Sequence, residues 1–173
     1  MIPLLLSSLI AGLDQLTKAM IIRGFFPGES VTVIPGLLNL TYVRNTGAAW
    51  GMLGGLNGWL AVLSIVMLAL IVVFRRSILE DVFVHKAALG FMIGGIVGNL
   101  IDRVRLLHVV DFLDFHWGPH HFPSFNVADS SICVGVGLYL LSSVWLASHP
   151  LHAARLSGPG APPSSPPVES SGA

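Results

Sequence analysis

Four long apolar runs divide the chain. They cover residues 1–22, 58–74, 82–101 and 127–147. A helix needs roughly 20 apolar residues to cross a bilayer, so each run predicts one transmembrane helix. Because the two long connections, 23–57 and 102–126, alternate with a short one, both are expected on the same face of the membrane.

The first long connection has the residue pattern of a small sheet. Val31–Ile34 and Leu37–Val43 are rich in Val, Thr, Ile, Leu and Tyr, and Pro35-Gly36 separates them, which is typical of a hairpin. Val109–Phe115, in the second connection, is compatible with either an interfacial helix or an irregular strand. The fold class predicted is an all-α membrane protein: four transmembrane helices with a small β-rich extracytoplasmic platform.

Basic residues decide the orientation only narrowly. Arg75 and Arg76 directly follow the second run, and basic residues next to a span favour the cytoplasmic side. We therefore expect both termini in the cytoplasm and a single four-span domain over residues 1–150. Residues 151–173 are rich in Pro and Ser, and such a segment buries too little apolar surface to fold, so a disordered cytoplasmic tail is predicted.

The composition supports a membrane protein and argues against a soluble, nucleic-acid-binding, disulfide-linked or metal-binding one. The chain is 53% apolar and 10% charged, where a soluble domain carries about 25% charged residues. Nine basic residues balance nine acidic ones without a basic stripe, so no nucleic acid is expected as a partner. A single cysteine, Cys133, excludes an internal disulfide and is expected to be a small packing residue. His116, His120 and His121 form the only histidine cluster, without metal-ligand spacing, so no metal is predicted.

The polar residues in or beside the apolar runs fall toward one face of the membrane. Charged groups at membrane depth are costly, so each is a candidate functional residue. The set is Asp14, Asn45, Asn99, Asp102, Arg103, Asp111, Asp114, Asn126 and Asp129. A cluster of this kind indicates a site at the end of the helices that carries the platform.

Asp111 and Asp129 offer paired-carboxylate chemistry. Two nearby carboxyl groups cannot both ionise easily, so one stays protonated while the other can accept a proton from water. Structural explanations stand beside this one: Asn126 and Asp129 have the spacing of a helix cap and first turn, and Asp111 or Asp114 can be a solvated loop acid.

Other polar residues are explained more simply as scaffolding. Asp14 and Lys18 lie four apart on one helical face, as an ion pair does. Asp102 and Arg103 can form a second structural pair, on the same helix face as Asn99. Three glycines at four-residue spacing in the third run indicate close helix packing: Gly90, Gly94 and Gly98.

In order and spacing, five motifs resemble those of lipoprotein signal peptidase, also called signal peptidase II. They are DQLTK at 14–18, RNTGAAWG at 44–51, GGIVGNLIDR at 94–103, VVDFLDF at 109–115 and FNVADS at 125–130. The resemblance covers roughly residues 5–147. It implies a four-helix aspartyl protease of the bacterial inner membrane, which cuts the signal peptide from prolipoproteins just before a cysteine carrying diacylglycerol.

Carried over by position, the resemblance implies a role for each matching residue. Asp111 and Asp129 match the catalytic dyad. Residues matching positions for substrate binding or dyad support are Asp14, Asn45, Asn99, Arg103 and Asn126, whereas Asp102 and Lys18 are expected to be structural. No cofactor is implied, and the expected partners are the prolipoprotein and membrane lipid, with a monomeric enzyme acting at the outer face.

Two positions depart from the family pattern. Only 13 residues precede Asp14, which is short for the family, so we expect a tilted first span or a start upstream of Met1. Leu107 stands where members often have Gly, and a positive φ there would strain a leucine.

The alternative from another class is a proton-coupled transporter with Asp14, Asp102 and Arg103 as a relay. A non-catalytic protein that binds lipid or peptide in the same cleft is a third possibility. Against a transporter, the opposite half of the bilayer holds almost no ionisable residue, whereas a through-path needs polar groups at both depths.

Overall fold

The computed structural model describes residues 1–47, 54–78 and 82–149, so the predicted tail over 151–173 lies outside the described residues. Four helices are long and apolar enough to cross a membrane, which confirms the predicted fold class. They are α1 (Ile2–Gly24), α2 (Asn57–Ile78), α3 (Phe83–Arg105) and α4 (Val127–Ser148). Because α3 continues past the predicted end at residue 101, Asp102 and Arg103 lie in its last turn.

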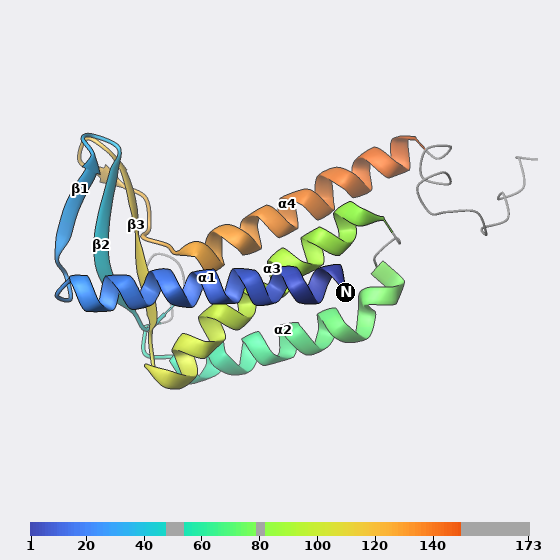
Figure 1. Cartoon of the computed structure of the whole chain (residues 1–173), viewed down its shortest axis with the longest axis horizontal. Helices are drawn as coiled ribbons and strands as arrows, with labels where there is room; N and C mark the ends of the chain where they lie inside the picture. The colour runs from blue at the N-terminus through green and yellow to red at the C-terminus, as the bar shows by residue number, and fades with distance from the viewer. Residues whose placement is uncertain (48–53, 79–81, 150–173) are drawn as a thin grey trace, which may run out of the picture.

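A four-stranded antiparallel sheet covers one end of the helices (Figure 1). Its strands, in spatial order, are β1 (Ser30–Ile34), β2 (Leu38–Asn45), β3 (Val109–Trp117) and β4 (His120–His121). The hairpin between β1 and β2 turns at Gly36, whose φ of 77° suits glycine. The sheet is larger than predicted, because β3 pairs along β2. Of the two possibilities for residues 109–115, the structure shows the strand and not the interfacial helix.

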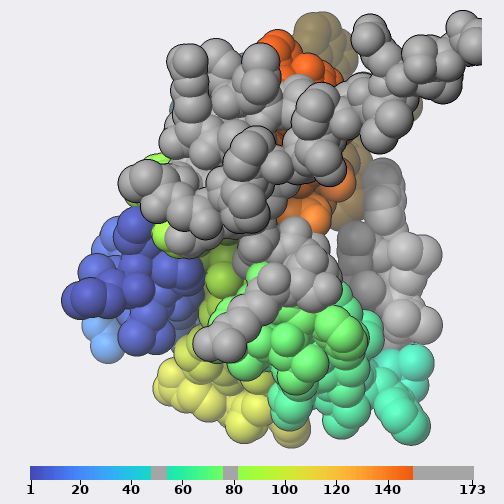
Figure 2. Space-filling model, turned by 90° about the vertical axis from the view of Figure 1, so that its right-hand side faces the viewer, coloured from blue at the N-terminus to red at the C-terminus, as the bar shows by residue number. Residues whose placement is uncertain are grey.

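Helix α3 lies at the centre of the bundle and packs against α1, α2 and α4. A Cβ at Gly90 would lie 2.9 Å from Leu6, and one at Gly94 would lie 2.8 Å from Ile10, so both glycines let α1 approach closely. This confirms the helix packing predicted from the glycine row. Figure 2, which views the end away from the sheet, shows α1 and α2 on opposite sides of α3.

An apolar cluster joins the sheet to the last turns of α1. Ile21 of α1 packs with Tyr42 of β2 and with Val110 and Phe112 of β3, all of them buried. This contact fixes β3 beside the helices. Between α3 and β3 the chain turns at Leu107, whose φ is 63°. A leucine therefore adopts the positive φ that the glycine in the family pattern suggested for this position.

Candidate active site

The start of α4 places Asp129 toward the sheet end of the bundle. Asn126 caps the helix: its side-chain Oδ1 accepts a hydrogen bond from the Asp129 backbone N–H at 2.9 Å. The Asp129 carboxylate accepts from the Asn126 backbone N–H at 3.3 Å, which completes a capping box. Its other oxygen accepts from Asn99 Nδ2 at 2.8 Å. The predicted cap is therefore confirmed, and together with Asn99 it fixes both oxygens of Asp129.

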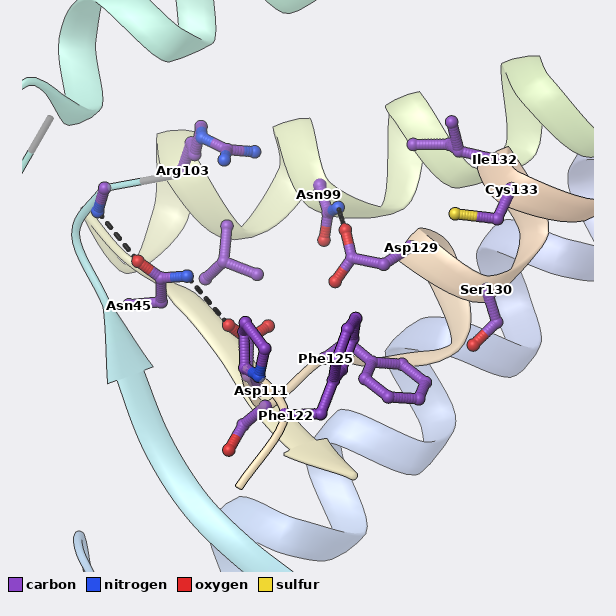
Figure 3. Close-up of a pocket in the computed structure, with 14 residues that line it drawn as sticks. Asn45, Asn99, Arg103, Asp111, Phe122, Phe125, Asp129, Ser130, Ile132 and Cys133 are labelled. Atoms are coloured by element: carbon purple, nitrogen blue, oxygen red, sulfur yellow. Dashed lines mark hydrogen bonds between the residues drawn. The ribbon is translucent and has the colours of Figure 1, made fainter. Parts of the chain in front are cut away.

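Strand β3 presents Asp111 to the same place. Asp111 Oδ1 accepts from Asn126 Nδ2 at 2.7 Å, and Oδ2 accepts from Asn45 Nδ2 at 2.9 Å. The Asn45 amide is oriented because its oxygen accepts from the Gly47 backbone N–H at 2.9 Å. Fully buried Asn126 thus contacts both acids, donating to Asp111 and accepting from the backbone of Asp129. Figure 3 shows the two carboxylates facing one space.

Burial raises the pKa of Asp111 to about 7, and the negative charge of Asp129 acts in the same direction. Hydrogen bonds from Asn45 and Asn126, together with the charge of Lys18, oppose the rise in the pKa of Asp111. A carboxyl group with this pKa is about half protonated at pH 7, so it can donate a proton near neutral pH, as acid catalysis requires.

Lys18 lies at the centre of a buried ionic cluster beneath the two acids. Its Nζ lies 2.9 Å from Asp14 Oδ2 and 2.9 Å from Asp102 Oδ2, and it donates to Asn99 Oδ1 at 2.9 Å. Lys18, Asp14 and Asp102 are each at most 2% exposed, so the ammonium is held by three acceptors rather than by water. The Asp14–Lys18 pair expected from spacing is confirmed, and Asp102 and Asn99 complete it.

The ionic cluster also holds the backbone that carries the two acids. Asp14 Oδ1 accepts from the Ala128 N–H at 2.9 Å, one residue before Asp129. Asp102 Oδ2 accepts from the Val110 N–H at 3.1 Å, one residue before Asp111. Each carboxylate of the cluster therefore fixes the main chain beside one acid of the pair.

Gln15 is a residue whose role the sequence reasoning missed. Its Nε2 donates to Asp102 Oδ1 at 2.9 Å and to the Gly98 carbonyl at 3.1 Å, so it satisfies the second oxygen of Asp102. Its place in the 14–18 motif, directly after Asp14, was the signal available. Spacing alone does not show that it faces α3, because its partners lie more than 80 residues away.

A cavity of about 490 Å³ opens beside Asp111 and Asp129. Arg103 lines it from α3, and its Nε is one of the few buried side-chain polar atoms in the described ranges without a hydrogen-bond partner. Phe122 and Phe125 form an aromatic side, and the cavity continues along α4 to Cys133 (Figure 3). Cys133 is exposed, so its predicted role as a packing residue is wrong: its position on α4 faces this cavity and not the interior of the bundle.

The structure gathers the candidate residues, except Asp114, into one connected group; Asp114 pairs with His121 instead. Asn45, Asn99, Arg103, Asp111 and Asp129 line the cavity. Asn126 links the two acids, and Asp14, Lys18 and Asp102 lie beneath them. In the ranges that the structure describes, no three His, Cys, Asp or Glu side chains are grouped as a metal ion would require.

These features define a class of protein. A bundle of membrane-spanning helices carries two carboxyl groups on different elements, and both line one cavity at the bundle end. Such a pair, in which one carboxyl group has a pKa raised toward neutral pH, is typical of an acid–base hydrolase.

Comparisons with known proteins identify the family. The profile described as signal peptidase (SPase) II matches residues 6–145. The chain is 44% identical over 142 residues to the lipoprotein signal peptidase of Syntrophotalea carbinolica, covering 80% of this chain and 88% of that protein. It is also 44% identical to that of Bacillus pumilus, over 75% of this chain and 83% of the relative. The chain belongs to the signal peptidase II family, whose members are aspartic proteases.

Solved structures agree with this assignment. A structure described as a bacterial membrane enzyme at 2.3 Å resolution superposes with a TM-score of 0.76 at 36% identity, covering 84% of this chain and 89% of the other. A second one, at 1.9 Å, gives a TM-score of 0.71 at 36% identity, over 81% and 90% of the two chains. The predictions of family and of a membrane peptidase are confirmed, and the transporter alternative finds no support.

Proposed function

We propose that this protein removes signal peptides from prolipoproteins that carry diacylglycerol on a cysteine, cutting the peptide bond just before that cysteine. The observation that carries the proposal is the joint placement of Asp111 and Asp129, which share a buried amide neighbour and line one cavity. The relatives named lipoprotein signal peptidase support this choice of substrate.

The proposed chemistry gives each acid one role at a time. Asp129 is ionised and accepts a proton from a water molecule, whose oxygen attacks the scissile carbonyl carbon. Protonated Asp111 donates its proton to the carbonyl oxygen, and a neutral tetrahedral intermediate with two hydroxyl groups forms. The helix N-terminus beneath Asp129 favours its negative charge before the reaction, and the raised pKa of Asp111 keeps its proton available.

Collapse of the intermediate restores both acids. The carbon–nitrogen bond breaks, and the departing nitrogen takes the proton that Asp129 had accepted. One hydroxyl group returns its proton to Asp111 as the new carboxyl group forms. The step consumes one water molecule and leaves Asp111 protonated and Asp129 ionised, so the proposed reaction uses no metal or organic cofactor.

The remaining site residues hold and orient in this proposal. Asn45, Asn99 and Asn126 donate to the acids and keep their oxygens in place. Arg103 lines the cavity, and a guanidinium group, which carries only donors, is suited to bind a carbonyl oxygen of the substrate. Asp14 supports the two acids, because its carboxylate accepts from the backbone beside Asp129. Asp102 and Lys18 are structural: Asp102 accepts from the backbone beside Asp111, and Lys18 pairs with both carboxylates.

The cavity also suits a substrate that lies partly in the bilayer. Its aromatic residues and its extension to Ile132 and Cys133 provide apolar contact along a membrane-spanning helix. In this proposal the acyl chains enter sideways from the lipid, and the peptide crosses the cavity beside the acids.

The proposed location is the bacterial inner membrane. The first residue of α1 and the last turn of α4 lie at the end of the bundle away from the sheet (Figure 1), so the proposal places both in the cytoplasm and the sheet on the outer face. Residues 1–150 are proposed as one four-span domain that acts as a monomer, because one chain supplies both acids.

Removal of either acid tests the proposal. Asp111→Asn and Asp129→Asn should each lower the rate of signal-peptide release by at least about 10³-fold, because each removes one proton carrier. The assay uses purified protein and a diacylglyceryl-modified prolipoprotein, with the size shift of the product as readout and insertion into membranes as the control for folding. Full cleavage by both variants would contradict the proposal, as would equal cleavage of precursor lacking diacylglycerol.

A further inference from the structure

Asp114 and His121 form an ion pair away from the two acids. Asp114 follows Asp111 by three positions on β3, and residues an odd number apart on a strand face opposite sides. Asp114 is buried, and its Oδ1 lies 2.8 Å from His121 Nδ1. His121 lies on β4 and, although half exposed, pairs with this carboxylate.

Further contacts join this pair to the rest of the sheet. Asn39 of β2 lies opposite Asp114 and donates from Nδ2 to Asp114 Oδ2 at 3.1 Å. Thr32 of β1 donates to Asn39 Oδ1 at 3.0 Å, which fixes the direction of that amide. The His116 ring stacks on His121 at 5.0 Å. Burial acts to raise the pKa of Asp114, but the hydrogen bonds from His121 and Asn39 outweigh it and lower that pKa.

The ion pair stands at one end of a wall of the active-site cavity. We call residues 122–125, which directly follow His121, the cavity wall, because all four line the cavity. At its far end, Phe125 exchanges two backbone hydrogen bonds with Leu113, of 2.8 and 3.1 Å. At its near end, the Phe122 N–H donates to the Phe115 carbonyl at 2.8 Å, and His121 adds the side-chain link to Asp114.

We propose that Asp114 and His121 are positioning residues that hold the near end of the cavity wall and so set the fit of the bound prolipoprotein. Phe125 has its own backbone bonds and lies beside Asn126, so loss of the ion pair releases the near end of the wall while the acids keep their positions. The inference rests on the proposed function, since it concerns binding of that substrate. The pair therefore acts on substrate affinity and leaves the chemical step unchanged.

Kinetics of the full-length protein test the pair directly. His121→Ala and Asp114→Ala should each raise KM for the diacylglyceryl prolipoprotein about fivefold with kcat within about twofold, a modest effect because His121 is half exposed. The double variant should cost no more than either single variant, because both remove the same link. His121→Gln, which keeps a side-chain donor, should recover most of the affinity.

His120→Ala is the matched control, because His120 is the exposed neighbour of His121 on β4. It should leave both KM and kcat at the level of the unchanged protein. A fall in kcat at constant KM in His121→Ala would overturn the proposal, and so would an equal rise in KM in His120→Ala.

The single cysteine provides a second measurement that needs no activity. Cys133 lines the same cavity and is the only thiol in the chain. Its reaction with a maleimide in detergent should be faster in His121→Ala than in His120→Ala, because the released wall opens the cavity. Equal labelling rates would overturn the inference even if the protein cleaved no prolipoprotein, so the failure of this proposal and that of the proposed function are distinguishable.

Discussion

Helices α2 and α3 have nearly the same length but opposite relations to the rest of the molecule. The most apolar window of α2 has no buried residue, whereas half of the corresponding window of α3 is buried. Yet α2 is the more apolar helix, with a mean hydropathy of 2.4 against 1.4. In this protein, high hydropathy marks the helix that faces lipid, and glycines with scattered polar residues mark the helix at the centre.

The comparison has a physical reason. In a bilayer the lipid is as apolar as a leucine side chain, so an apolar surface gains little by packing on another helix. Polar groups need partners in that medium, and small residues let such partners approach. Asn99 and Asp102 of α3 find Lys18 and Gln15 of α1 in this way.

Among the differences between α2 and α3, the largest is expected from a single methyl group on α3. A Cβ at Gly95 would collide with the carbonyl oxygen of Ala128, in the turn that carries Asp129. Gly95→Ala should therefore displace the start of α4 and lower the cleavage rate by about 100-fold or more, with a loss of stability of about 1–3 kcal/mol. Gly58→Ala on α2, where a Cβ meets nothing within 4 Å, is the control. Similar cleavage rates in Gly95→Ala and Gly58→Ala would contradict the conclusion that α3 is the closely packed helix and α2 is not.

A polar truncation on each helix should give the next largest difference. Asn99→Ala leaves Lys18 without one acceptor and Asp129 without one donor. Leaving buried polar groups unpaired costs about 1–3 kcal/mol, so kcat should fall by about tenfold to 100-fold. Ser64→Ala on α2 removes only a bond to the Leu60 carbonyl of its own helix and should leave kcat unchanged. Steady-state assays of both variants measure the difference, and a kcat within twofold for Asn99→Ala would contradict it.

The pH dependence of cleavage should show a smaller difference between the polar end of the bundle and α2. Asp111 must hold a proton in the proposed reaction, and its pKa is raised to about 7, so the rate should fall as pH rises through about 7. Asn45→Ala removes a hydrogen bond that lowers the pKa of Asp111. The descending limb should therefore move to higher pH in this variant. A pH–rate profile of kcat measures it, and Ser64→Ala should leave the limb in place; a shift to lower pH in Asn45→Ala would reverse the assignment of the proton.

The smallest effect is expected at the ends of the two helices. Leu107 follows α3 with φ 63° and is exposed, while Gly55 precedes α2 with φ 83°. Leu107→Gly should relieve backbone strain and raise the melting temperature by a few degrees, since such strain costs about 1 kcal/mol. Gly55→Ala should lower it by a similar amount. Thermal unfolding in detergent checks both, and a change of the same sign in the two variants would show that φ does not decide the outcome.

Much of the site can be predicted from the sequence, because several of its contacts join residues only three or four positions apart. Asn126 and Asp129 lie three residues apart, which fits a cap, and Asp14 and Lys18 lie four apart, which fits an ion pair. The spacing of apolar residues also located all four helices. Leu107 was found as a departure from a family pattern, and the backbone angle there agrees.

The rest depends on contacts between distant parts of the chain. Asn39 meets Asp114 across 75 residues, and Lys18 meets Asn99 across 81. Nothing in the local pattern of Val109–Phe115 distinguishes a strand from a helix, because β3 gains its hydrogen bonds only when β2 lies beside it. The local sequence also does not show which way Cys133 faces, because that depends on where the cavity lies.

The division of the two acids between sheet and bundle has a consequence for biogenesis. Asp111 belongs to a strand that pairs with β2, and Asp129 belongs to α4, which follows the other three described helices along the chain. A nascent chain whose fourth helix has not yet inserted holds one acid without the other. In the proposed mechanism, which needs both acids, hydrolysis therefore begins only once α4 has inserted, so neighbouring chains at the insertion site do not meet an unfinished protease.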